Sequence, residues 1–323
     1  MRTLVPAVVL ALTLAVGTAA SSTGGSIPQA ATVRACAAAG PYWPTMTLAL
    51  NGTSAWVACK EQARVERVDL TRKLASANVP LSSSAIAVAN GLGSIWALDA
   101  SSTLSRIDPR TARITKRIRL DASAPYNIWI GAGSAWVADD QGARVLRVSP
   151  STNKVVARIP VGDGPADMVF AGRTAWVVDH RDNTLFRIDT KTNAPTRVGA
   201  LQGQNMAAER MVLAGGSIWV TGRGVGLLQV DPATGATRRS LGIGGTGIDI
   251  VSAAGALWIP VRTAAVDQRG FPTMTAVRRV TTGGAVSTAA TARGRVDVHG
   301  LTTGAGAVWL ADNTAGFLYR LRT

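Results

Sequence analysis

The segment Gly172–Asp189, GRTAWVVDHRDNTLFRID, contains the pattern that predicts the fold, because it recurs along the chain. In each copy a Trp follows a Gly-containing turn, and an Arg between apolar residues usually follows ten or eleven positions later. The Trp copies, 39 to 51 residues apart, are Trp56, Trp96, Trp136, Trp176, Trp219, Trp258 and Trp309. The second marker stands at Arg67, Arg106, Arg147, Arg187, Gln229, Arg279 and Arg320. A repeat near 40 residues is typical of propellers, solenoids and arrays.

Each repeat resolves into four short apolar or alternating runs. In the fourth repeat these are Asp167–Phe170, Ala175–Asp179, Thr184–Asp189 and Pro195–Leu201. Gly, Asn, Asp and Thr separate the runs, which is the composition of tight turns between strands. Four strands per unit match one blade of a β-propeller. The sequence therefore predicts an all-β, seven-bladed β-propeller of four-stranded antiparallel blades, with the repeated Trp packed between blades and the repeated Arg in a structural role.

The first and last repeats predict how the ring closes. The last repeat ends at Phe317–Arg322, which is only its third strand. We expect Ala31–Ala37 to supply the outer strand of this blade, which would remove an exposed sheet edge. The sixth repeat has about ten extra residues within Pro260–Met274, and insertions in repeat proteins fall in loops that often belong to a binding face. A neutral surface insertion is the alternative.

The N-terminal residues indicate export. Residues 1–20 combine one Arg, an apolar run and small residues, as a cleaved signal peptide does. An uncleaved anchor is the alternative. Residues 21–30 are interpreted as a flexible linker, and residues 31–323 as a single propeller domain. We expect a secreted or extracytoplasmic monomer with no membrane span after cleavage of the signal.

Two further features of the composition bear on the environment and partners of the protein. Cys36 and Cys59 are the only cysteines and suit one disulfide in an oxidising compartment, with two free thiols as the alternative. A net charge of +15 favours anionic partners such as a cell-surface polymer. A solubility charge spread evenly over the surface would give the same total.

Residues 145–189, VLRVSPSTNKVVARIPVGDGPADMVFAGRTAWVVDHRDNTLFRID, resemble the YVTN-type propeller repeats. The G-x-x-W-[VIL] strands are similar to those of the streptogramin (virginiamycin B) lyase family. The resemblance covers roughly residues 32–323. It implies that loops joining the second and third strands share one rim with the loops between blades, and that the other loops form the opposite face.

That layout separates the charges. Most of the 19 acidic residues fall on the first rim. The opposite face receives the hairpins that carry Arg72, Lys73, Arg110, Arg113, Lys116, Lys154, Lys191, Arg238 and Arg239. The sequence thus predicts a polarised disc, with an acid-rich rim for a small or cationic ligand or a protein. Its basic face would bind an anionic surface polymer.

Candidate ligand-binding residues stand where the inner strands begin, nine residues before each Trp. These positions are polar in several blades and include Asn127, Asp167, Arg210 and Asp249. Asp179 and His180, three and four residues after Trp176, are expected to fold back beside Asp167. A polar ring above apolar strands suits the mouth of a ligand-binding channel, although a solvated pore mouth would have the same pattern.

The resemblance also implies an alternative function. Streptogramin lyases eliminate an ester link with a His base and a Mg²⁺ held by carboxylates. Asp297-Val298-His299 followed by Asp312 resembles that arrangement, with His299 as base and with Asp297 and Asp312 as catalytic carboxylates and ligands of Mg²⁺ or Ca²⁺. Asp replaces the family's Glu in both places, and Ile248 and Asp249 stand where a second His is expected.

We therefore favour a binding or scaffold protein that needs no cofactor, with a metal-assisted carbon–oxygen lyase as the alternative. Nucleic-acid binding through the basic face is a second alternative. It is disfavoured because this face lacks interleaved aromatic residues for base stacking.

Overall fold

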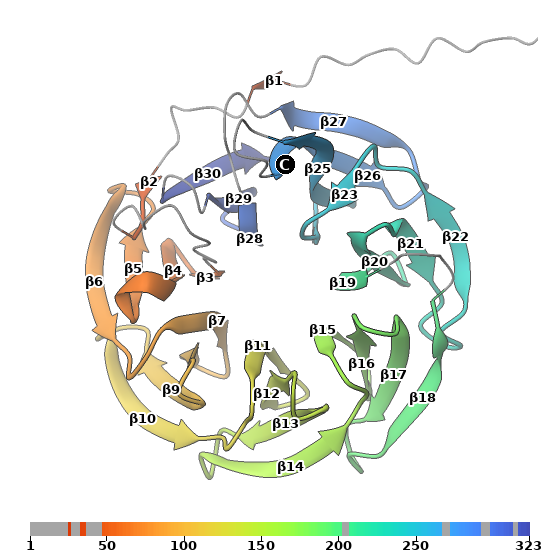
Figure 1. Cartoon of the computed structure of the whole chain (residues 1–323). Coiled ribbons are helices and arrows are strands. Elements are labelled where there is room, and N and C mark those ends of the chain that lie inside the picture. The colour runs from red at the N-terminus through yellow and green to blue at the C-terminus, as the bar shows by residue number, and fades with distance from the viewer. Residues whose placement is uncertain are drawn as a thin grey trace, which may run out of the picture.

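The chain forms a ring of seven antiparallel β-sheets around a central axis (Figure 1). The computed structural model describes residues 25–26, 33–36, 47–201, 207–266, 272–291, 298–312 and 316–323. Six sheets have four strands and one has six, which confirms the predicted seven-bladed propeller. Within those ranges no helix has the length and apolar character needed to cross a bilayer.

The strands follow one another outward from the axis within each blade. Blades 1 and 2 consist of β3 (Leu48–Asn51), β4 (Ser54–Cys59), β5 (Arg64–Asp69), β6 (Leu74–Pro80), β7 (Ala85–Gly91), β8 (Ser94–Asp99), β9 (Thr103–Asp108) and β10 (Arg113–Arg119). Blades 3 and 4 consist of β11 (Pro125–Gly131), β12 (Ser134–Asp139), β13 (Arg144–Ser149), β14 (Lys154–Pro160), β15 (Pro165–Ala171), β16 (Thr174–Asp179), β17 (Thr184–Asp189) and β18 (Pro195–Ala200). A 3-10 turn, η2 (Lys60–Gln62), connects β4 and β5.

The second half of the ring is less regular. Blade 5 consists of β19 (Ala207–Ala214), β20 (Ser217–Arg223), β21 (Gly226–Val230) and β22 (Thr237–Leu241). Blade 6 consists of β23 (Thr246–Gly247), β24 (Val251–Ala253), β25 (Ala256–Val266), β26 (Pro272–Thr281) and β27 (Val286–Thr291), edged by β1 (Gly25–Ser26). Blade 7 consists of β28 (Val298–Gly304), β29 (Ala307–Asp312), β30 (Phe317–Arg322) and β2 (Val33–Arg34).

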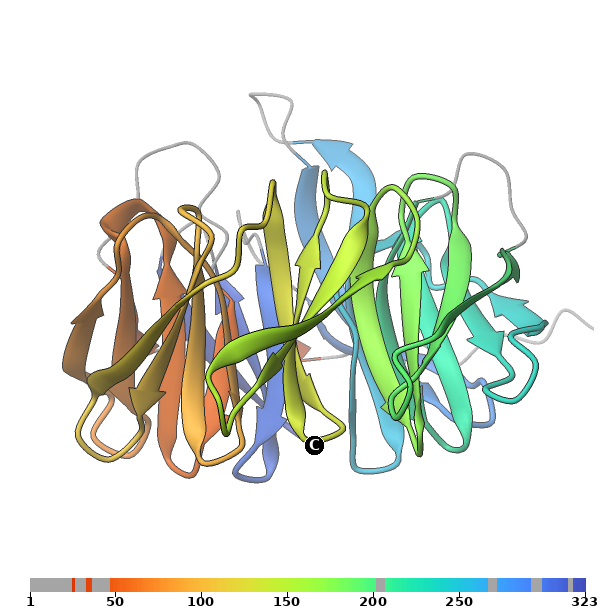
Figure 2. The same cartoon turned by 90° about the horizontal axis from the view of Figure 1, so that it is seen from below.

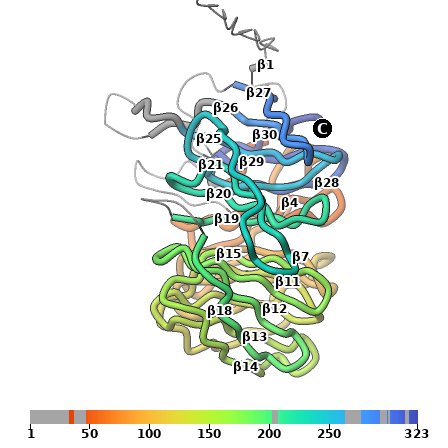
Figure 3. Tube along the Cα trace, turned by 90° about the vertical axis from the view of Figure 1, so that its right-hand side faces the viewer, coloured from red at the N-terminus to blue at the C-terminus, as the bar shows by residue number. Residues whose placement is uncertain are grey.

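The disc has two ends, seen edge-on in Figures 2 and 3. We call the upper rim the end formed by loops between the second and third strands and by loops between blades. The lower face is formed by the other two hairpin classes. The insertion of the sixth repeat lengthens β25 and β26, so that this hairpin stands out from the upper rim. Residues 267–271 at its tip lie outside the described residues.

The Gly of the repeat sits in a tight turn on the lower face. In blades 2 and 3 the two central turn residues both have positive φ, as in Leu92 (53°) with Gly93 (70°) and Ala132 (46°) with Gly133 (68°). Two consecutive positive φ values match a two-residue hairpin whose twist suits its strands. Glycine adopts this conformation without a Cβ clash, which explains its place in the motif.

The repeated Trp fills the gap between consecutive blades, as predicted. Trp56, Trp96, Trp136, Trp176 and Trp219 are at most 1 % exposed. Trp136, for example, belongs to one buried cluster with Met168 and Ile188 of blade 4. Seven such clusters occupy the seven junctions of the ring. The core is therefore a ring of inter-blade interfaces.

The repeated Arg joins blades on the lower face. The Nε of Arg106 donates to Ser94 Oγ (2.8 Å), and its Nη1 donates to Pro150 O (2.7 Å) and Asn153 Oδ1 (3.3 Å) of blade 3. The guanidinium carbon lies 5.2 Å from the ring centroid of Trp96. We call this set of contacts the arginine clasp. It confirms the structural role predicted for the repeated Arg.

Blade 5 builds the clasp from different residues. Gln229 replaces the Arg, and its Nε2 donates to Ser217 Oγ (2.8 Å). Arg239 on the paired strand donates to Gln229 Oε1 (2.6 Å) and to the carbonyls of Thr282 and Gly283 in blade 6. The guanidinium of Arg239 lies 5.4 Å from the Trp219 ring centroid. The clasp thus persists although the repeat has changed.

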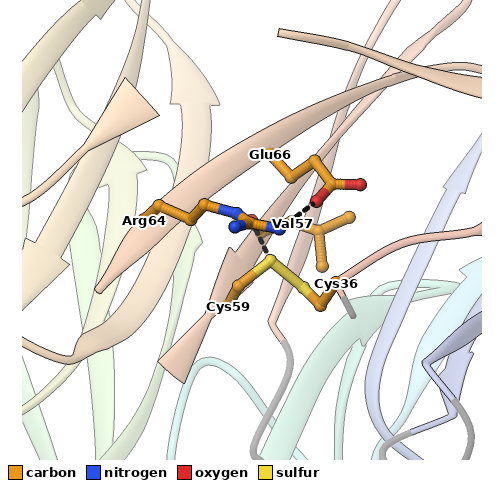
Figure 4. The surroundings of a disulfide bond; sticks show 5 residues. All are labelled: Cys36, Val57, Cys59, Arg64 and Glu66. Atoms are coloured by element: carbon orange, nitrogen blue, oxygen red, sulfur yellow. Dashed lines mark hydrogen bonds and ion pairs between the residues drawn. A yellow bond between two sulfur atoms is a disulfide. The ribbon is translucent and has the colours of Figure 1, made fainter. Parts of the chain in front are cut away.

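The ring closes through the N-terminal segment. Val33 and Arg34 of β2 pair antiparallel with Leu318 and Phe317 of β30, which confirms that the N-terminal segment completes blade 7. The predicted disulfide between Cys36 and Cys59 is also present, with Cα atoms 5.6 Å apart (Figure 4). Because Cys36 follows β2 and Cys59 ends β4, the disulfide links the closing strand to blade 1. Gly25–Ser26, within the expected linker, pair with β27.

Candidate functional site

The residues that open the inner strands bind the backbone of the next blade. Asp167 Oδ1 accepts from its neighbour Met168 N (2.8 Å), and Oδ2 accepts from Met211 N of blade 5 (2.6 Å). Thr47 Oγ1 accepts from Val88 N of blade 2 (2.9 Å). These bonds fix adjacent inner strands at the channel mouth.

Three of the predicted ligand-binding residues form one charged group here. Arg210 of blade 5 is flanked by Asp167 of blade 4 and Asp249 of blade 6, and its Nε lies 3.9 Å from Asp249 Oδ1. Arg210 Nη1 also donates to Glu209 O (2.8 Å). Asp167 is 6 % exposed, and its Oδ1 accepts from Trp129 Nε1 of blade 3 (2.7 Å). We call Asp167, Arg210 and Asp249 the channel triad.

Burial controls the charges of the triad. It raises the pKa of Asp249 to about 7, although the cation of Arg210 partly opposes the shift. It also raises the pKa of Asp167, against the effects of Arg210 and of the N–H donors. Burial alone would lower the pKa of Arg210. That pKa is nevertheless raised, because Tyr126, Asp249 and Asp167 favour the cation. The triad therefore holds a fixed cation between carboxyls that titrate above their usual range.

Tyr126 and His180 extend this group toward the surface. The Tyr126 side chain forms a hydrogen bond with Arg210. Its ring stacks on the imidazole of His180, with centroids 6.3 Å apart and planes at 29°. His180 Nδ1 is buried and has no hydrogen-bond partner in the part of the chain that the structure describes. A half-exposed aromatic ring and an unused imidazole nitrogen thus stand beside the triad.

Asn127 and Asp179, also predicted to bind ligand, make local contacts. Asn127 Oδ1 accepts from Ile128 N (2.8 Å). Asp179 is fully buried, and its carboxylate accepts from Gly164 N (2.7 Å) and Arg181 N (2.8 Å). Asp99 and Asp139 hold rim loops in the same way in blades 2 and 3. Asp179 therefore stabilises a loop beside the triad.

The lyase-like constellation falls only partly within the described residues. Asp297 lies outside them, and for His299 the backbone alone is described, at an irregularity of β28. Asp312 is fully buried, and Tyr319 Oη donates to its Oδ2 (3.2 Å). Asp312 occupies the register position of Asp99, Asp139 and Asp179. The convergence of Asp297, His299 and Asp312 stays a prediction.

The described side chains offer little for a metal ion. One group of three potential ligands lies close enough together to share an ion, namely Cys36, Cys59 and Glu66. Its two sulfur atoms form the disulfide, and Arg64 Nη2 pairs with Glu66 at 3.0 Å (Figure 4). This group therefore lacks the thiolates that a metal would need. Asp297 and Asp312 remain the predicted metal ligands.

Ion pairs offset part of the charge at both ends, and on the lower face Asp69, Asp189 and Asp231 pair with Arg72, Arg173 and Arg238. On the upper rim Asp140, Asp182 and Glu209 pair with Arg181, Arg197 and Arg223. Exposed carboxylates remain at Glu61, Asp121 and Asp163. Cations on the lower face and outer strands are exposed at Arg110, Arg113, Lys116, Arg117, Arg119, Lys154, Arg158 and Lys191.

The fold and this geometry define the class as a seven-bladed β-propeller with a charged channel mouth. Virginiamycin B lyase from Staphylococcus aureus is similar in structure, with a TM-score of 0.73, 16 % identity and coverage of 90 % of this chain and 98 % of that one. A streptogramin B lyase structure gives a TM-score of 0.73 and 14 % identity over 90 % and 97 % of the two chains. Hydrazine synthase of Kuenenia stuttgartiensis gives a TM-score of 0.70 and 15 % identity, with coverage of 87 % of this chain and 95 % of that one.

These similarities confirm the predicted resemblance at the level of the fold. No family model and no curated protein sequence matches the chain. At such low identity a shared propeller shows the fold alone, since propellers support many functions. The site itself must therefore carry the functional argument.

Two residues of the site were missed by sequence reasoning. Tyr126 directly precedes Asn127, and Trp129 follows it by two positions. The available signal was that two aromatic residues, Tyr126 and Trp129, flank the polar residue Asn127 near the start of an inner strand. Their partners, Arg210 and Asp167, lie in later blades, so the pairing itself could not be read from the sequence.

Proposed function

We propose that this protein is an exported propeller that binds a small organic cation at the channel mouth. The observation that carries the proposal is the channel triad, a buried group with two carboxyls and one guanidinium. The charges of the triad do not recur in the repeat, because the other blades have Thr47, Ala87, Asn127 and Gly300 at the corresponding positions. The triad is therefore a feature of this chain and not of the scaffold.

The charge of the triad favours a cationic ligand. When both carboxyls are ionised, they outnumber the single cation of Arg210. Asp249, with its pKa near 7, is the carboxyl that a ligand cation would ionise fully. An organic cation beside Asp249 would neutralise the carboxylate that Arg210 leaves unbalanced, and Asp249 would release its proton. Binding should therefore strengthen as the pH rises through about 7.

The aromatic residues at the mouth suit the organic part of such a ligand. Tyr126 is 39 % exposed and lies between Arg210 and His180. An aromatic face attracts ammonium groups and packs against apolar carbon. The proposed ligand is thus an amine with an apolar or aromatic body.

Benzylamine is a suitable probe, with benzyl alcohol as its uncharged counterpart. We expect the wild type to bind benzylamine in calorimetry at pH 8 and to bind benzyl alcohol at least about tenfold more weakly. Asp249→Asn should lose benzylamine binding. The matched control is Asp231→Asn on the lower face, whose carboxylate pairs with Arg238 at 2.7 Å. Equal affinity in both variants would remove the channel mouth from consideration.

The exposed cations support a second binding surface for an anionic cell-surface polymer. On β10 the side chains of Arg113, Lys116, Arg117 and Arg119 are all exposed. Retention on a polyphosphate column should weaken as salt rises, because screening reduces contacts between exposed charges. Arg117→Ser with Arg119→Ser should elute at lower salt than the wild type. If retention changed neither with salt nor with the two substitutions, the proposed binding of an anionic polymer at this surface would be wrong.

The lyase alternative rests on fold similarity and has a direct test. A catalytically inactive virginiamycin B lyase has been solved with quinupristin, which is therefore the substrate to try. With Mg²⁺ present, the binding proposal predicts that the quinupristin ring stays intact in mass spectrometry. Opening of the ring, lost in His299→Ala, would establish the lyase instead.

A further inference from the structure

The seam between blades 7 and 1 contains a pocket on the lower face, remote from the channel mouth. Its volume is about 290 Å³. The lining residues are Val33, Thr53, Leu70, Thr71, Lys73, Ala305, Trp309 and Arg320. The closing strand, the first hairpin of blade 1 and the last blade all contribute. We call it the seam pocket.

Four other junctions have an arginine clasp at the equivalent position, and at one of them, between blades 2 and 3, a cavity of about 390 Å³ lies beside the clasp. At the junction of blades 3 and 4, Arg147 Nε donates to Ser134 Oγ (2.9 Å) and Nη1 donates to Asn193 Oδ1 (2.8 Å). Ser134 stands two residues before Trp136, and Asn193 has a φ of 62° in the hairpin of the next blade. Arg106 has the corresponding partners Ser94 and Asn153. In these two clasps the arginine thus binds one hydroxyl and one side-chain amide, whereas Arg67 binds Ser54 Oγ and the carbonyl of Arg110.

At the seam both partners have changed. Ala307 stands two residues before Trp309, where the clasp needs Ser. Lys73, with a φ of 58°, stands where blades 3 and 4 have Asn153 and Asn193. Within the described residues the side chains of Arg320 and Lys73 have no hydrogen-bond or ion-pair partner. A second cation has therefore replaced the amide that would receive the arginine.

No carboxylate offsets these two cations in the pocket. None of its lining residues is acidic. Asp69, the acidic residue of the same hairpin, uses Oδ1 to accept from Thr71 N (2.9 Å), Thr71 Oγ1 (2.6 Å) and Arg72 N (3.0 Å). Its pKa is lowered by these hydrogen bonds, those of Thr71 and Arg72 foremost. Asp69 is therefore committed to the turn.

We propose that the seam pocket binds an oxyanion carried on a small apolar group. The guanidinium of Arg320 offers the planar pair of donors that a phosphate, sulfate or carboxylate accepts, and Lys73 adds a point charge. Val33, Leu70 and Trp309 form apolar walls for the remainder of the ligand. The volume lies near the lower end of the range for small-molecule sites, so the ligand is small.

The test uses phenyl phosphate as the probe, with inorganic phosphate and phenol as its two halves. Isothermal calorimetry of the wild type should show binding of phenyl phosphate at least about tenfold tighter than that of either half, since each half lacks one class of contact. If inorganic phosphate bound as tightly as phenyl phosphate, the pocket would bind the anion alone, and the proposed contact of its apolar walls with the ligand would be wrong. Absence of phenyl phosphate binding would overturn the whole proposal.

Lys73→Asn is the decisive variant, because it restores the amide found in blades 3 and 4. We expect it to weaken phenyl phosphate binding about tenfold or more and to leave the melting temperature equal or higher, since Arg320 gains a partner. Lys154→Asn is the control, an exposed lysine of the lower-face hairpin that carries Asn153. Equal losses in both variants would assign the binding to the general charge of the face and contradict the seam pocket. Benzylamine binding should be unchanged in both, so this test is independent of the channel mouth.

Discussion

Two arginines, Arg147 of blade 3 on the lower face and Arg210 of blade 5 at the channel mouth, have different surroundings. Arg147 recurs in the repeat, stacks on Trp136 and donates to Ser134, Thr190 O and Asn193. All of its acceptors are neutral, and every one belongs to a turn or hairpin. The guanidinium thus fastens blade 3 to blade 4.

Arg210 has no counterpart in the repeat and lies between the buried carboxyl of Asp167 and the partly buried carboxyl of Asp249. Buried ion pairs contribute little net stability, since desolvation offsets their attraction. The comparison indicates that the repeated arginine has a packing role, and it supports the proposed ligand-binding role of the unrepeated arginine on the axis. At the seam Arg320 lacks the Ser and Asn partners that the clasps of blades 2 and 3 have, and it lines the seam pocket.

The largest effect should follow removal of a repeated Trp. Trp136 is fully buried between blades, so Trp136→Ala should lower the free energy of unfolding by about 3–5 kcal/mol. Urea denaturation followed by circular dichroism measures the change. Benzylamine affinity of the folded variant should be unaltered. A loss below about 1 kcal/mol would mean that the repeat does not hold the blades together.

Opening the ring should cost somewhat less. Cys36→Ser with Cys59→Ser frees the closing strand from blade 1, and a loop of this length predicts a loss of about 3 kcal/mol. The melting temperature of the double variant should match that of the reduced wild type. If reduction and substitution both leave the melting temperature unchanged, pairing of β2 with β30 closes the ring unaided.

A transplant between blades tests the arginine clasp. Arg147→Gln removes the donors to blade 4 and should cost about 1–3 kcal/mol. Ala157 pairs with Arg147 as Arg239 pairs with Gln229, so adding Ala157→Arg recreates the arrangement of blade 5. The second substitution should recover part of the lost stability. Failure to recover any would show that the clasp depends on more of blade 5 than these two residues.

The smallest effect concerns pH. Because the pKa of Asp249 is raised to about 7 in the folded protein, its contribution to stability is present at low pH and is lost as the pH rises through 7. The melting temperature of the wild type relative to Asp249→Asn should therefore fall between pH 6 and pH 8, by about 2–4 °C for a change of about 1.4 kcal/mol. If the melting temperatures of the two proteins changed in parallel with pH, the titrating group would be a residue other than Asp249.

The sequence was sufficient for the fold because the signal is local and repeated. Each Trp, each Gly turn and each third-strand Arg could be assigned from its spacing alone. Even the closing strand followed from counting, since Phe317–Arg322 lacked a partner. Blade 5 shows the limit of this reasoning, because the exchange of Arg for Gln229 is compensated by Arg239 on another strand.

The site was less predictable because its contacts join different blades. Asp167 and Trp129 are 38 positions apart, and Asp167 and Met211 are 44 apart. Asp179 and Asp167 have the same side chain, yet one accepts backbone N–H groups of a loop and the other lies beside a guanidinium. Residue type cannot separate these roles. What could be recognised was that Arg210 and Asp249 depart from the pattern of the other blades.

The most direct test of the central claim is the titration of Asp249 followed by carboxyl ¹³C NMR, with and without benzylamine. The wild type without ligand should show a pKa near 7 for Asp249, and benzylamine should lower that pKa, because an adjacent cation favours the carboxylate. Asp231, on the lower face, should titrate identically in both samples. An Asp249 that titrates near 4 and ignores benzylamine would contradict both the buried triad and its proposed ligand.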